Sequence, residues 1–152
     1  MLTGLHFLLS YTCNFSCDHC FLYCSPTADG VFTARRIEEV LDEAVKISSL
    51  KQVYFEGGEP FLYYPLMLAG IRAARKRDLE VGIVTNSYWA TTTEDALLWL
   101  EPLKKLGVSL ISLSDDFFHY GDRSDTPPKN ALEAAQQLGL ASNYICIDQP
   151  HD

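Results

Sequence analysis

Hydrophobic and polar residues follow two repeating patterns along the chain. Five short apolar runs have the length and the β-branched or aromatic content of strands, and the segments between them repeat apolar residues with a helical period. The predicted strands are residues 5–11, 52–56, 80–85, 108–114 and 142–148. The predicted helices run from Thr33 through Val45, from Pro65 to about Arg77, from Thr91 to Gly107, and from Pro127 to Gly139.

Regular alternation of strands and helices predicts an α/β fold. Its sheet is parallel, because a helix between two strands returns the chain to the same end of the sheet, and it is either open or curled into part of a barrel. The chain has 152 residues, of which 47% are hydrophobic, enough for one substantial core. We therefore expect a single domain over residues 1–152.

Four segments of unusual composition each follow a predicted strand. They are CNFSCDHC (13–20), GGEP (57–60), TNS (85–87) and SDDFFHY (114–120). In parallel α/β folds, ligands bind beyond the carboxyl ends of the strands. We therefore expect these four segments to converge on one rim of the sheet and to form its functional site.

Charge and cysteine content narrow the possible partners and location. Twelve Lys and Arg against 20 Asp and Glu give a net charge of −8, which is unsuited to binding nucleic acid. The apolar start at residues 5–10 has no basic residue before it and is too short to span a membrane. Four of the five cysteines fall within residues 13–24, which favours metal or redox chemistry in a reducing compartment, and hence a cytoplasmic protein.

Three cysteines of the first segment are candidate metal ligands. Cys13, Cys17 and Cys20 can hold three corners of a cubane iron–sulfur cluster or three positions of a zinc tetrahedron, and their spacing alone does not choose. Three protein ligands leave one position free for substrate or cofactor, as in catalytic centres. The alternative is a closed structural zinc site with Cys24 or His19 as fourth ligand, but this leaves the GGEP segment unexplained.

Two of the segments together resemble a known family. Cys13-x-x-x-Cys17-x-x-Cys20 and the later Gly57-Gly58-Glu59-Pro60, each directly after a strand, are similar to the cysteine and glycine-rich motifs of the radical S-adenosylmethionine (SAM) superfamily. The resemblance implies a partial (β/α) TIM-like barrel of parallel strands with outer helices. About five strands are present, so the core looks incomplete at its carboxyl end.

The same resemblance implies the cofactors and the chemistry. A [4Fe-4S] cluster on Cys13, Cys17 and Cys20 would bind the amino and carboxylate groups of SAM through its unligated iron. An electron donor such as flavodoxin or ferredoxin would reduce the cluster. SAM would then be cleaved to methionine and a 5′-deoxyadenosyl radical that abstracts hydrogen from a substrate.

Further residues are implied as SAM contacts by their match to the motif positions. Gly57 and Gly58 let the main chain approach a small zwitterion, and Glu59, followed by Pro60, can face its ammonium group. His19 would lie near the adenine. The methionine carboxylate and ribose would be held by residues at the ends of the third and fourth strands, namely Thr85, Asn86 and Ser112 or Ser114.

The family does not fix the substrate, which is a peptide, a protein or a small metabolite. The GGEP, TNS and SLSDD segments together favour the peptide-modifying and cofactor-synthesis branches, whereas the short chain favours an activating enzyme of the glycyl-radical type. A function of another class is a non-catalytic metal-binding or interaction module.

The remaining unusual residues carry simpler expectations. Cys24 is expected to be a neighbour of the cluster or a loop thiol, and Cys146 a small buried residue within the last strand. For Asp115, Asp116 and His119 a solvated loop is expected, and contact with the substrate is the alternative. The aromatic residues of the cysteine segment are expected to be buried as a shield or by packing, namely Phe15, Phe21 and Tyr23.

Overall fold

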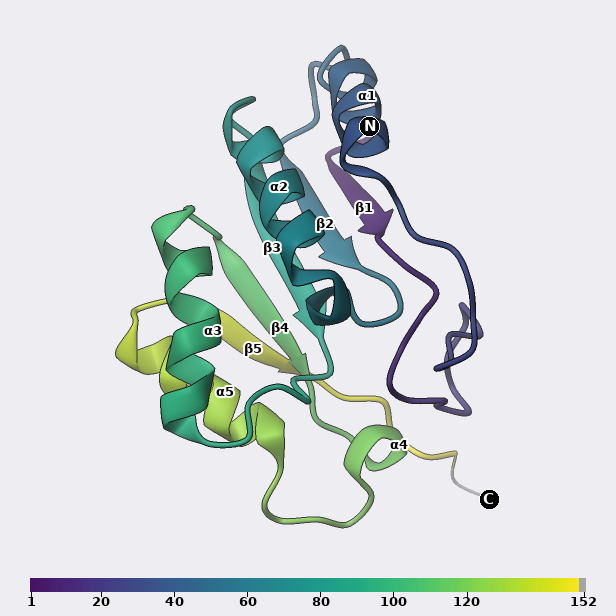
Figure 1. The fold of residues 1–152 in the computed structure, drawn as a ribbon, viewed down its shortest axis with the longest axis vertical. Coiled ribbons are helices and arrows are strands. Elements are labelled where there is room, and N and C mark those ends of the chain that lie inside the picture. The colour runs from purple at the N-terminus through teal and green to yellow at the C-terminus, as the bar shows by residue number, and fades with distance from the viewer. Residues whose placement is uncertain (151–152) are drawn as a thin grey trace.

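Five parallel strands form one sheet in the computed structural model, which describes residues 1–150 (Figure 1). They are β1 (Gly4–Leu8), β2 (Gln52–Glu56), β3 (Glu80–Thr85), β4 (Leu110–Ser114) and β5 (Ser142–Ile145). Neighbours in the sheet are neighbours in the sequence, from β1 to β5. This order, without the reversal of a doubly wound sheet, is that of a barrel segment. The predicted parallel sheet is confirmed, and within the described residues the barrel is not closed.

Four long helices connect the strands, as predicted. They are α1 (Ala34–Ala44), α2 (Tyr64–Arg75), α3 (Thr93–Lys105) and α5 (Pro127–Gln137). Two short helical segments were not predicted, the 3-10 helix η1 (Pro60–Tyr63) before α2 and the four-residue helix α4 (Phe117–Tyr120) after β4. The N-cap of α3 is Thr92, one residue after the predicted start at Thr91, because the Thr92 hydroxyl accepts the hydrogen bond from the Asp95 N–H.

The two faces of the sheet have different roles. One face is covered by the helices (Figure 1) and contributes fully buried apolar residues to the core, namely Val53, Phe55, Val81, Ile83, Ile111 and Leu113. Because side chains alternate along a strand, the residues between them point to the other face, which we call the inner face. The inner face carries His6, Leu8, Tyr54, Glu56, Gly82, Val84, Ser112 and Ser114.

The carboxyl ends of the strands finish at one rim. Leu8 is paired with Glu56, and Thr85 with Leu113, so the segments that follow β1 to β4 leave the sheet side by side. Figure 1 shows the chain after β1 extending past the arrowheads and α4 lying beyond the end of β4. The rim is therefore where the four unusual segments meet.

The segment between β1 and α1, residues 9–33, is called the cysteine loop. It folds back on itself, because Ser10 and Val31 form an antiparallel bridge and the N–H of Tyr11 donates to the carbonyl of Gly30 at 2.9 Å. These backbone hydrogen bonds hold the thiols of the loop in defined positions. None of the helices within residues 1–150 combines the length and the apolar character that a membrane span requires.

Candidate functional site

A pocket of about 150 Å³ lies at the rim, where the cysteine loop meets the ends of β2, β3 and β4. It is lined by residues from all four unusual segments. Nine of the residues predicted from the sequence line it, namely Cys13, Cys17, Cys20, His19, Gly57, Gly58, Thr85, Asn86 and Ser114. The fold therefore brings together side chains separated by about a hundred positions in the sequence.

The thiols are crowded and partly buried. The Sγ of Cys13 accepts hydrogen bonds from the N–H of Phe15 at 3.4 Å and the Nδ2 of Asn86 at 3.6 Å. Burial raises the pKa of Cys13 and of Cys17 to about 11, and neighbouring thiols contribute to the rise at Cys17. A bound cation reverses this preference, because it stabilises the thiolate form that ligates metals.

The spacing of the thiols bears on which metal centre they suit. Sulfurs around a tetrahedral zinc lie about 3.8 Å apart, given Zn–S bonds of about 2.3 Å. Within residues 1–150, the group of three candidate ligands whose atoms all lie within 4.8 Å of one another is His19, Asp116 and His119, which includes no cysteine. The sulfurs of Cys13, Cys17 and Cys20 therefore do not all lie within 4.8 Å of one another in this structure.

Cys24 is a fourth thiol at the same pocket. Its Sγ accepts a hydrogen bond from the Gly58 N–H at 3.2 Å, and its own N–H donates to the Sγ of Cys20 at 3.4 Å. Burial raises the pKa of Cys24. Cys24 therefore connects the cysteine loop to the turn after β2, and its role as a neighbour rather than a ligand stays a prediction.

The turn after β2, residues 57–60, is called the glycine turn. Gly57 and Gly58 have φ of +81° and +54°, in the left-handed region that favours glycine. A Cβ added at position 57 would lie 2.6 Å from the Cα of Leu8. A Cβ added at position 58 would lie 2.2 Å from the carbonyl oxygen of Thr12. The sequence analysis explained these glycines by the close approach of a ligand. The structure shows that close packing against the chain's own backbone already requires glycine at both positions.

Glu59 occupies a different position from the one expected. It is 0% exposed and, like Pro60, does not line the pocket. Its Oε1 accepts from the Thr85 hydroxyl at 2.8 Å and the Phe61 N–H at 3.0 Å, and its Oε2 accepts from the Asn86 N–H at 2.8 Å. In this arrangement the carboxylate faces the protein rather than a ligand, and it fixes the end of β3 from behind the pocket.

Burial raises the pKa of Glu59 to about 7, although these three hydrogen bonds lower it. The signal that identifies this role is available only in three dimensions, since Glu59 and its hydrogen-bond donors at the end of β3, Thr85 and Asn86, are 26 and 27 positions apart.

Asn86, directly after β3, has a polar side chain that reaches the thiol of Cys13. Its Nδ2 donates to the Oδ1 of Asn14 at 2.9 Å as well as to Cys13, and its carbonyl accepts from the hydroxyl of Tyr120 at 2.5 Å. Asn86 thus links the cysteine loop, β3 and α4. Asn14 and Tyr120 were missed in the sequence, because their neighbours carried stronger motifs.

The two serines of β4, Ser112 and Ser114, have different surroundings. Ser114 lines the pocket, whereas Ser112 is buried and donates its hydroxyl to the Oδ1 of Asn143 on β5 at 2.8 Å. Both lie on the inner face, as the two-residue period predicts. Of the two alternatives considered, the structure brings Ser114 to the pocket and not Ser112.

The prediction of a solvated loop after β4 is wrong for Asp116 and His119. Asp116 caps α4, and its buried Oδ1 accepts from the N–H of His119 at 3.1 Å and from the His119 Nδ1 at 2.8 Å. His119 lines the pocket, and its ring lies 5.2 Å from that of His19. The D-x-x-H spacing is a helix-capping pattern that the sequence analysis overlooked.

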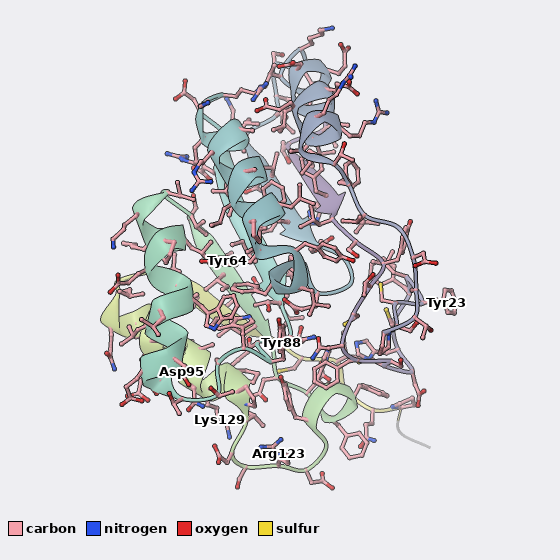
Figure 2. All side chains as sticks on the ribbon, viewed as in Figure 1. Tyr23, Tyr64, Tyr88, Asp95, Arg123 and Lys129 are labelled. Atoms are coloured by element: carbon pink, nitrogen blue, oxygen red, sulfur yellow. The ribbon has the colours of Figure 1, made fainter. Side chains whose placement is uncertain are left out.

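Three further expectations are also wrong. Cys146 is exposed just beyond β5, where its thiol donates to the Asp115 carbonyl at 3.1 Å. Phe21 and Tyr23 are 80% and 88% exposed, and Figure 2 shows Tyr23 at the outer edge of the cysteine loop. Phe15 is the aromatic residue that packs, with its ring edge-on to Tyr120 at 5.5 Å.

Similar sequences come from bacteria and archaea. The chain is 26% identical over 129 residues to YydG of Bacillus subtilis (strain 168), described as a peptide biosynthesis protein, and covers 40% of it with 85% of its own length. It is 33% identical over 113 residues to the tungsten-containing aldehyde ferredoxin oxidoreductase cofactor-modifying protein of Pyrococcus furiosus, with 74% of the chain covering 30% of that protein.

A third relative is GTP 3′,8-cyclase of Rhodococcus opacus (strain B4), 30% identical over 141 residues, with 88% of the chain covering 39% of that enzyme. The chain thus spans less than half the length of these curated relatives. Among solved structures, BtrN in complex with SAM and 2-DOIA superposes with a TM-score of 0.70 at 14% identity, over 96% of this chain and 57% of that one.

Methylornithine synthase (PylB) superposes with a TM-score of 0.67 at 17% identity, over 94% of this chain and 44% of that one. At such low identities these two structures show the shared fold alone. The sequence model of the radical SAM superfamily matches residues 7–147, which include the end of β1, the cysteine loop, the glycine turn and all of β2 to β5. The chain therefore belongs to the radical SAM superfamily.

Proposed function

We propose that Cys13, Cys17 and Cys20 hold a [4Fe-4S] cluster and that SAM binds against it in the rim pocket. One observation carries the proposal: three thiols, two glycines and an amide side chain from three separate segments converge on a single pocket. When bound and reduced by a donor such as flavodoxin or ferredoxin, the cluster and SAM supply a 5′-deoxyadenosyl radical. The donor set fits, because thiolates are the ligands of such clusters.

The protein residues around the pocket have distinct roles in this proposal. The thiols bind iron, and the main chain of Gly57 and Gly58 with the side chains of Thr85, Asn86 and Ser114 surrounds the ligand. Glu59 acts from behind, because its hydrogen bonds set the positions of Thr85 and Asn86. His19 lines the same pocket, and within residues 1–150 its buried ring nitrogen Nδ1 has no hydrogen-bond partner, so it can form a hydrogen bond with a ligand.

The substrate class follows less directly. The relatives include a peptide biosynthesis protein, a cofactor-modifying protein and a nucleotide cyclase, and these share a superfamily rather than a substrate. We propose a radical modification of a peptide, a protein or a small metabolite. We also propose that a chain of this length is active, although the relatives are more than twice as long.

Anaerobic reconstitution with iron and sulfide tests the proposed centre. We expect a brown protein with a [4Fe-4S] content near one cluster per chain, whose reduced electron paramagnetic resonance signal changes when SAM is added. Cys17→Ala should lose the cluster. Cys146→Ala is the matched control and should keep it, because Cys146 is exposed outside the pocket.

A colourless protein that binds zinc and has no affinity for SAM would contradict the proposal. That result would instead support a non-catalytic metal-binding module. The same preparations distinguish the two functions, because iron, zinc and sulfide are measured in each.

A further inference from the structure

A second hollow, of about 400 Å³, lies beside β1 and is not used by the proposed cofactors. It is lined by His6 and Leu8 of β1 and by residues of the cysteine loop, namely Tyr11, Gly30, Val31 and Phe32. None of these residues lines the rim pocket. The hollow is held open by backbone, since Phe32 N–H donates to the Leu9 carbonyl at 3.0 Å beside the bridge from Ser10 to Val31.

The hollow and the rim pocket meet at one pair of side chains. His6 lines the hollow, Glu56 lines the rim pocket, and the His6 Nδ1 lies 2.9 Å from the Glu56 Oε1. An ionised carboxylate only accepts hydrogen bonds, so Nδ1 is the donor, and in the neutral imidazole Nε2 is left as an acceptor. Within residues 1–150 the Oε2 of Glu56 has no hydrogen-bond partner. With His6 neutral, the pair therefore offers two acceptors to a ligand, His6 Nε2 and Glu56 Oε2.

The His6 ring is held in place by its neighbours on the inner face. It stacks on the ring of Tyr54 with centroids 4.7 Å apart and planes 15° apart. Tyr54 in turn leans over Gly82, where a Cβ would lie 2.2 Å from its Cε1, so only glycine leaves room for it. The imidazole is half exposed yet fixed from two sides, by Glu56 and by Tyr54.

The rest of the hollow is apolar and lacks cations. Leu8, Tyr11, Val31 and Phe32 form its walls. Residues 1–34 and 52–71, which supply every residue of the hollow together with Tyr54 and Glu56, contain no lysine or arginine. Figure 2 shows Arg123, in the loop after α4, far from β1. A phosphate or carboxylate finds no lysine or arginine among these residues, whereas an N–H donor finds the Glu56 carboxylate and the Nε2 of the neutral His6 imidazole.

We propose that this hollow is a substrate site for an aliphatic amine, the lysine side chain of a peptide. The methylene stem packs on Leu8 and Val31, and the ammonium group donates to His6 Nε2 and Glu56 Oε2. The peptide then lies along the inner face next to the rim pocket. This assignment rests on the proposed function for what the rim pocket does, but the binding step itself does not need the cofactors.

Binding of short peptides to the reconstituted protein tests this directly. The probes are acetyl-glycyl-lysyl-glycine amide and versions with norleucine or glutamate in place of lysine, measured by calorimetry with SAM present. We expect the lysine peptide to bind about tenfold more tightly than the norleucine peptide, as one charge-assisted hydrogen bond provides, and the glutamate peptide to bind most weakly. Equal or weaker binding of the lysine peptide would overturn the assignment.

Two variants locate the binding. Glu56→Gln should reduce the preference for lysine over norleucine to near parity, and Val31→Trp should fill the hollow and weaken both peptides. Val45→Trp is the matched control, because Val45 is 41% exposed at the end of α1 and Val31 is 46% exposed. Unchanged binding in both Glu56→Gln and Val31→Trp would place the peptide elsewhere.

The same preparations separate this inference from the proposed function. A wild-type protein that cleaves SAM but shows no lysine preference overturns the amine site alone. A protein that prefers the lysine peptide but fails to cleave SAM supports the amine site and contradicts the proposed function.

Discussion

The helix-covered face of the sheet and its rim are built in opposite ways. On the helix-covered face, apolar residues recur with the strand and helix periods and are buried against one another, as Val53, Ile83 and Leu100 are. At the rim, polar groups are buried and satisfied one by one, as Glu59 and Asp116 are. The core tolerates changes that keep volume, whereas the rim depends on individual atoms.

This contrast explains where strain and unfavourable charge gather. Crowded thiols, a buried carboxylate and two glycines with positive φ all lie within the rim. Each is costly by itself and is retained where a site needs it. The helix-covered face supplies the stability that supports these features.

The largest expected effect comes from breaking the rim at Gly58. Gly58→Ala should lower the free energy of unfolding by about 4 kcal/mol, because left-handed backbone strain adds to a collision with the Thr12 carbonyl. Gly139→Ala is the control. It has a similar φ of +61° but nothing closer than 3.9 Å to its Cβ, so it should cost about 1 kcal/mol. Equal costs in denaturant titrations would contradict the proposed close packing.

A cavity in the core should lower the free energy of unfolding slightly less than Gly58→Ala does, and it should leave the rim intact. Leu100→Ala on α3 should lower the free energy of unfolding by about 3 kcal/mol through loss of burial and an incompletely filled cavity. At temperatures where the variant is folded, its cluster content should match that of the wild type. Loss of iron in the folded variant would show that the two regions are not independent.

The pH dependence of stability sharpens the comparison at Glu59. Its pKa is raised from 4.5 to about 7 by burial, so the folded state holds the proton more tightly than the unfolded state. This contribution is fully present below about pH 4.5 and is lost as the pH rises to about 7. Relative to Glu59→Gln, which does not titrate, the wild-type unfolding free energy should fall by about 2 to 3 kcal/mol over that window. A constant difference from pH 4 to 8 would contradict it.

The smallest expected effect is on the outer surface. Glu39 on α1 pairs with Arg35 at 2.9 Å and Arg36 at 3.1 Å, and these cations lower its pKa. All three side chains are exposed, so water and salt screen the pairs. Glu39→Gln should leave the melting temperature unchanged at physiological ionic strength, and a clear decrease would show a coupled network.

The sequence predicts the two regions unequally. Periodicity is a local property, so the five strands and the four long helices could be predicted from it. The site could be assigned to the rim because each unusual segment follows a predicted strand. The hydrogen bonds and the burial of individual side chains at the rim could not be predicted, because they depend on contacts between residues that are distant in the sequence. Glu59 reads as a ligand-facing acid until its partners at Thr85 and Asn86 are known, and Cys146 reads as a strand residue until β5 ends at Ile145.

The most direct test of the central claim is the amount of 5′-deoxyadenosine formed from SAM under strong reductant by the reconstituted protein. We expect the wild type and Cys146→Ala to form it at similar rates, and Cys17→Ala to form none above the protein-free background. Equal formation by Cys17→Ala, or none by a wild type that carries its full cluster, would contradict the account.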